Sequence, residues 1–138
     1  SLKAENAEDL TETAKSLTDI FRKALNNDKL DVRVEMLKDE NISAMMTLSE
    51  ESRRMQDMMK MYGMTGMDPS MFGTNETLVL NAGHPLVKYV LEQPGGEHTA
   101  LYCAQLYDLA MLSHKQLSPD AMTKFIARSN QIMMLLAK

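Results

Sequence analysis

A chain of 138 residues with 44% hydrophobic and 25% charged residues fits one globular domain with its own core. The net charge of −4, without a dense run of lysine or arginine, disfavours binding to nucleic acid, and no apolar run approaches the roughly 20 residues that span a membrane. The single cysteine, Cys103, excludes an internal disulfide and a multi-cysteine zinc site, and it favours a reducing compartment such as the cytoplasm.

The N-terminal segment is the first predicted helix. From about residue 6 to residue 25, apolar residues recur at steps of three and four and form one stripe. The alternating segments 30–37 and 42–49 each predict a strand with one buried face. Because only a short polar turn separates them, we expect these two strands to pair as an antiparallel hairpin.

The next segment contains many of the chain's 14 methionines. Ser49, followed by two glutamates, predicts the start of a helix that runs to about residue 62. Four of its residues fall at i, i+3, i+4 and i+7 and so share one face: Met55, Met58, Met59 and Tyr62. Methionine is flexible and polarisable, so this stripe suits either an irregular core or a surface that binds many partners. The apolar residues of the following loop, 63–75, favour an exposed surface.

A third strand and three helices complete the predicted fold. The consecutive residues Leu78, Val79 and Leu80 indicate a central strand that is buried on both faces. Pro85 begins a short helix, and two longer helices follow at about 97–115 and from Ser118 onward. We expect one α+β domain with a small, three-stranded, mainly antiparallel sheet packed with helices. Its parts are an N-terminal helix (1–28), the sheet with the methionine-rich helix and loop (30–96), and two dimerisation helices (97–138).

The last two helices are apolar over most of their circumference. Between residues 100 and 112 only Gln105 and Asp108 are strongly polar, and the final helix has apolar residues both at heptad spacing and outside it. Such helices either lie deep inside the monomer or are covered by another subunit. We expect the second arrangement, in which the two-helix hairpin forms a four-helix bundle with a second copy. The residues expected in this interface are Leu109, Leu112, Ile132, Met133 and Leu136.

The sequence offers few candidates for chemistry. Four methionines near the loop suit monovalent copper as thioether ligands, but no histidine or cysteine lies near them, so we expect no metal site. These are Met61, Met64, Met67 and Met71. The histidines are expected to be structural: His84 as a helix cap, His98 at a helix start and His114 at a helix end. With no phosphate-binding loop and no nucleophile elbow, we expect no catalytic residue and no enzymatic activity.

Five segments, in order, resemble the C-terminal domain of the heat-shock protein 90 family of chaperones, of the bacterial HtpG type. NAGHPLVKYV is similar to the N-P-x-H motif and its apolar helix; Asn81 and His84 match, and Ala82 replaces the proline. FIARSNQIMMLL is similar to the F-I-x-R-x-N-x-L-L ending of the family. LDVRVEMLKDENISAMMT, RMQDMMK and QLYDLAMLS are similar to its first hairpin, its exposed amphipathic helix and its penultimate helix. The resemblance extends over nearly all of the chain after Leu30.

The resemblance implies a homodimer formed by the last two helices and a methionine-rich helix that contacts unfolded client proteins. ATP and magnesium would bind in an N-terminal domain of the parent chaperone, so this segment is expected to hold no cofactor. The chain ends at Lys138 without the acidic tail of eukaryotic cytosolic members. The missing tail argues against a tetratricopeptide co-chaperone as a partner. The charge and the lack of a long apolar run argue against nucleic acid and membrane as partners.

Two other functions stay open. One is a methionine-rich signal-sequence-binding module like that of the signal recognition particle, which would also hold RNA and be basic. The charge of −4 and the predicted strands disfavour it. The other is a purely structural oligomerisation domain without a client surface. Crosslinking to an unfolded protein, with and without the methionine stripe, would distinguish that function from a chaperone's.

Overall fold

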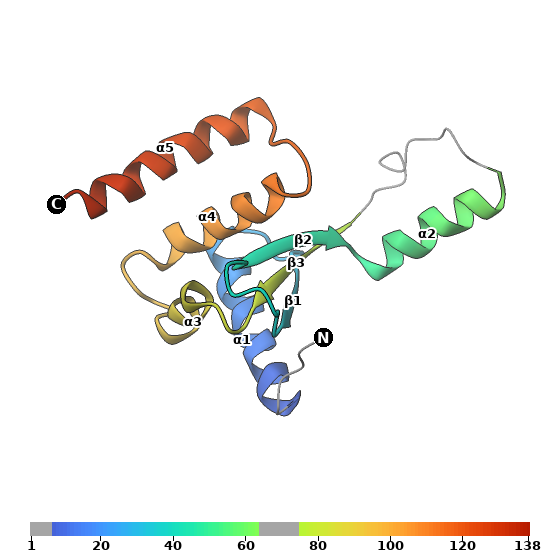
Figure 1. The fold of residues 1–138 in the computed structure, drawn as a ribbon, viewed down its shortest axis with the longest axis horizontal. Helices are drawn as coiled ribbons and strands as arrows, with labels where there is room; N and C mark the ends of the chain where they lie inside the picture. Colours follow the sequence, from blue (N-terminus) through green and yellow to red (C-terminus); the bar gives the residue numbers. More distant parts are fainter. Residues whose placement is uncertain (1–6, 64–74) are drawn as a thin grey trace.

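The computed structural model describes residues 7–63 and 75–138, and it describes side chains from residue 10 onward in the first helix. In chain order these residues form α1 (Ala7–Ala24), β1 (Asp31–Glu35), β2 (Ala44–Leu48), α2 (Glu50–Met61), β3 (Glu76–Asn81), α3 (Pro85–Glu92), α4 (Thr99–Leu112) and α5 (Pro119–Leu136) (Figure 1). The predicted α+β class is confirmed. Most of the expected loop, residues 64–74, lies outside the described residues.

The helix starts that were predicted from capping residues are confirmed. The hydroxyl oxygens of Ser49 and Ser118 accept the backbone N–H groups of Ser52 and Ala121, at 3.1 and 3.2 Å. His84 accepts a backbone N–H from the first turn of α3 through its ring Nδ1. Each such cap satisfies a donor that the helix itself leaves free and contributes about 1 kcal/mol.

The sheet is mixed, and the predicted hairpin is wrong. The strand order is β1-β3-β2, with β3 parallel to β1 and antiparallel to β2. The chain does reverse direction between β1 and β2, but β3 lies between them, so one parallel pair and one antiparallel pair replace the mainly antiparallel sheet. The physical reason is that β3 is apolar on both faces and is buried from Thr77 to Asn81, which suits the central position. The strands with one apolar face take the edges.

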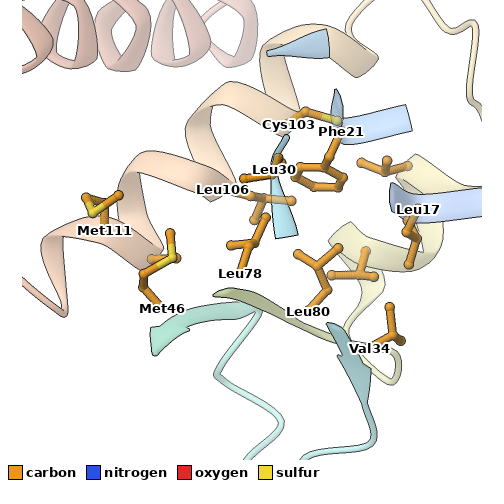
Figure 2. Packing of buried hydrophobic residues seen from close by; sticks show 13 residues of the cluster. Leu17, Phe21, Leu30, Val34, Met46, Leu78, Leu80, Cys103, Leu106 and Met111 are labelled. Carbon is orange, nitrogen blue, oxygen red and sulfur yellow. The ribbon is translucent and has the colours of Figure 1, made fainter. Parts of the chain in front are cut away.

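The core lies on one face of the sheet, where α1 packs over β1 and α4 packs over β2. Side chains from all three strands point into it (Figure 2): Val34, Met46, Leu78 and Leu80. Leu17 and Phe21 of α1 are fully buried, as are Cys103 and Leu106 of α4. The predicted apolar stripe of the first helix is therefore part of the core, and so is the single cysteine.

Two helices lie at the outside of this body (Figure 1). α5 packs along the outer side of α4 and contributes no buried residue. α2 stands away from the sheet, beyond the end of β2. Among the described residues, no helix combines the length and the apolar character needed to cross a membrane.

Candidate functional site

The exposed surface of α2 is the first candidate site. Met55 and Tyr62 are exposed, and Met58 has 56% of its surface accessible to solvent. Met59, in contrast, is only 9% exposed. Among the described elements, no helix or strand packs extensively along α2. The structure therefore places three residues of the predicted stripe at the surface and buries the fourth.

The first turn of α2 is fastened to the residue before β3. The backbone N–H of Ser49 donates to the carbonyl oxygen of Asn75 at 2.9 Å. The backbone N–H of Asn75 donates in turn to the hydroxyl oxygen of Ser52 at 2.7 Å, and Ser52 is buried. Glutamates in the first turn and Lys60 in the last complement the helix dipole. The base of α2 is therefore tied by backbone hydrogen bonds to the start of β3.

The outer surface of α5 is the second candidate site. No residue of α5 is buried, and Leu136 is 81% exposed. Its exposed large apolar residues are Ile126, Met133, Met134, Leu135 and Leu136. Of the five residues expected in a dimer interface, Leu109, Met133 and Leu136 are exposed and Leu112 and Ile132 are half-buried. None of the five belongs to the core of the monomer.

The apolar character of α4 has a different explanation. α4 lies between the sheet and α5 and also contacts α1 and α3, so neighbours cover several of its sides. The deep-burial interpretation thus accounts for most of α4, including Cys103, Leu106 and Ala110. It does not account for the five exposed large apolar side chains of α5, which the monomer leaves uncovered.

A polar cluster that the sequence analysis missed holds α5 against α4. Nη1 of Arg128 lies 3.0 Å from Oδ2 of Asp108, and the two side chains are 16% and 13% exposed. The same nitrogen donates to Oε1 of Gln105 at 3.2 Å, and Nε2 of Gln105 donates to Oγ of Ser129 at 3.1 Å. These directional contacts fix how the two helices lie against each other. The sequence does hold one sign of this cluster: Gln105 and Asp108 are the only strongly polar residues in an otherwise apolar stretch of α4.

A second polar cluster surrounds Glu76 at the start of β3. Its Oε1 accepts a hydrogen bond from Nζ of Lys115 at 3.2 Å, and its Oε2 lies 3.0 Å from Nε2 of His114. In the part of the chain that the structure describes, this Oε2 has no aligned hydrogen-bond partner, so its contact with His114 is a close approach of the two side chains. Burial, with smaller contributions from Glu76 and Asp108, raises the pKa of the neighbouring Tyr107 phenol. The cluster links the sheet to the turn between α4 and α5.

The asparagine of the NAGHP segment has a structural role. Asn81 is buried, and its Oδ1 accepts the backbone N–H groups of Leu37 and Gly83 at 3.2 and 3.0 Å. Its Nδ2 donates to the carbonyl oxygen of Ile42 at 2.8 Å. One side chain therefore braces both the 36–43 connection and the turn before α3. This role explains an asparagine at the end of the central strand without invoking catalysis.

Among the described residues, little points to a metal-binding or catalytic site. They contain no group of three or more His, Cys, Asp or Glu side chains that could hold a metal ion. Burial raises the pKa of the Cys103 thiol to about 12, which makes it a poor nucleophile. Of the four methionines considered for copper, only Met61 lies within the described residues.

No protein-family model matches the chain, and no curated protein matches it significantly. A function for this domain therefore has to be argued from its own surfaces. The two that stand out are the methionine-rich side of α2 and the uncovered apolar side of α5.

Proposed function

We propose that this domain pairs two subunits and contacts unfolded client polypeptides in an ATP-dependent chaperone of the heat-shock protein 90 family, bacterial HtpG type. The α4–α5 hairpin forms the homodimer, and the surface of α2 receives the client. The chain itself catalyses no reaction, and its parent works in the cytoplasm. The observation that carries the proposal is that α5 has no buried residue although it holds five exposed large apolar side chains.

The exposed surface of α5 supports homodimerisation on energetic grounds. Fully burying a leucine or methionine side chain contributes about 1.5–3 kcal/mol, so Met133 and Leu136 each have much to gain from a partner. A second copy offers the same surface, and two helical hairpins that meet about a twofold axis make a four-helix bundle. Obligate homodimer interfaces typically bury about 2,000 Å² or more in total, so pairing of the two hairpins would have to cover most of the exposed apolar residues of α5.

The side chains of α2 support client contact. Met55, Met58 and Tyr62 offer apolar area without a fixed shape, because methionine adopts many conformations at little cost. A surface of this kind fits unfolded segments of many sequences. Exposed charged residues, among them Arg53 and Asp57, accompany the apolar ones on α2 and keep it hydrated.

Two double variants test the two parts of the proposal separately: dimerisation through α5 and client contact through α2. Met133→Asp with Leu136→Asp places charges on the outer side of α5, and Met58→Asp with Met61→Asp makes the same kind of change on α2. All four residues are exposed, so both variants should fold. We expect the first to lose dimerisation in light scattering. We expect the second to stay dimeric and to lose binding to reduced, carboxymethylated lactalbumin, a permanently unfolded polypeptide.

A purely structural oligomerisation domain is the second candidate. The burial of Met59 favours it, because part of the methionine stripe then serves packing rather than binding. If this candidate is correct, the α2 double variant binds the unfolded polypeptide as the unmodified chain does. If the α5 double variant stays dimeric, the proposed interface is wrong.

A further inference from the structure

Asn75 and Glu76 stand between the two candidate surfaces. The backbone of Asn75 is hydrogen-bonded in both directions to the first turn of α2, through Ser49 and Ser52. The neighbouring residue, Glu76, is the first residue of β3. From Thr77 onward the strand is buried, so Glu76 is joined to a closely packed element.

The side chain of Glu76 reaches from there to the turn between α4 and α5. Its Oε1 accepts a hydrogen bond from Lys115 at 3.2 Å, and its Oε2 lies 3.0 Å from His114 without an aligned hydrogen bond. Only 19% of the Glu76 side chain is exposed. Lys115 is the cationic partner of this largely buried carboxylate, and a carboxylate shielded from water holds a cation more firmly than an exposed one does. Besides the packing of its half-buried residues on α4, this turn and the Arg128 cluster set the position of α5.

We infer that Glu76 couples the binding of an unfolded polypeptide on α2 to the pairing of two copies through α5. A polypeptide on α2 steadies the base of that helix and so the backbone of Asn75. Glu76 then holds the α4–α5 turn in one position, and α5 loses less conformational freedom when it pairs. Client binding therefore tightens the dimer, and by linkage the dimer binds client more tightly by the same factor. The inference rests on the proposed function.

The experiment measures the dimer dissociation constant of the whole chain by subunit-exchange fluorescence, with and without a saturating unstructured peptide of leucine, serine and lysine. In the unmodified chain the peptide should lower this constant by about fivefold or more, the lower end of usual coupling factors. In Glu76→Gln the effect should fall below about twofold. Glu35→Gln is the matched control: it makes the same change in a carboxylate that pairs with Arg33 at 2.6 Å, away from the junction. It should keep the full effect.

A second variant guards against misfolding of Glu76→Gln. His114→Gln with Lys115→Gln removes the partners from an exposed turn and should also abolish the coupling, with the circular dichroism spectrum unchanged. The inference is overturned if the peptide leaves the dimer constant of the unmodified chain unchanged, or if both junction variants keep the full effect. A chain that neither pairs nor binds the peptide contradicts the proposed function itself. A chain that does both without coupling contradicts only this inference.

Discussion

Replacement of Arg128 by methionine probes how α5 is held. The change leaves Asp108, which is 13% exposed, without its cation and removes the hydrogen bond to Gln105. Breaking one side of a buried ion pair destabilises by about 3–5 kcal/mol, and the residual exposure of this pair points to the lower end. Because no residue of α5 is buried in the core, the loss should fall on the α4–α5 contact and spare the sheet.

Amide hydrogen exchange measures this loss by segment. A change of about 3 kcal/mol corresponds to exchange in α5 that is about a hundredfold faster, with β3 unchanged. Replacing both partners, Arg128→Met with Asp108→Leu, should restore most of the protection, since an apolar pair of similar size leaves no charge unpaired. Equal acceleration in α5 and β3, or no recovery in the double variant, would refute this account of the hairpin.

Two further changes give distinct results. Met59→Ala should lower the free energy of unfolding by about 2 kcal/mol, the low end for a buried methionine, because Met59 lies outside the central cluster. Met58→Ala should change the free energy of unfolding by less than about 0.5 kcal/mol, because Met58 is exposed. Similar denaturation midpoints for the two variants would contradict the burial of Met59 and the exposure of Met58. Burial raises the pKa of the Cys103 thiol from 9.0 in the unfolded chain to about 12 in the folded one. Its contribution to stability is therefore complete below pH 9 and falls by about 1.4 kcal/mol per pH unit between these two pKa values. Relative to Cys103→Ala, the unmodified chain should therefore lose stability more steeply above pH 9 in urea denaturation, and parallel curves would count against a buried thiol.

The features that the sequence predicts well depend on local chemistry. Ser49 and Ser118 are hydroxyl caps, each beside acidic or proline residues that favour a first turn, and both helices begin there. The apolar run at Leu78–Leu80 favours the most buried strand of the sheet, and that strand is β3, which lies between the other two. In each case the decisive residues lie within a few positions of one another.

The features that it misses depend on contacts between distant segments. A short turn favours a hairpin, but the 36–43 connection is long enough for β3 to lie between β1 and β2. Because β3 begins only at residue 76, nothing in the local sequence indicates this insertion. Helical spacing places Met58 and Met59 at i+3 and i+4 from Met55, and so in one stripe, yet it does not show which of them is covered. The pairing of Arg128 with Asp108 depends on how two helices align, and no local pattern encodes that alignment.

The solution mass of the unmodified chain across a dilution series tests the central claim most directly. Multi-angle light scattering at micromolar concentrations should give twice the chain mass of 15.6 kDa, with a shift towards one chain mass only on strong dilution. The expected dimer follows from an outer helix that has no buried residue and several exposed large apolar side chains. A mass of 15.6 kDa throughout the micromolar range would contradict it.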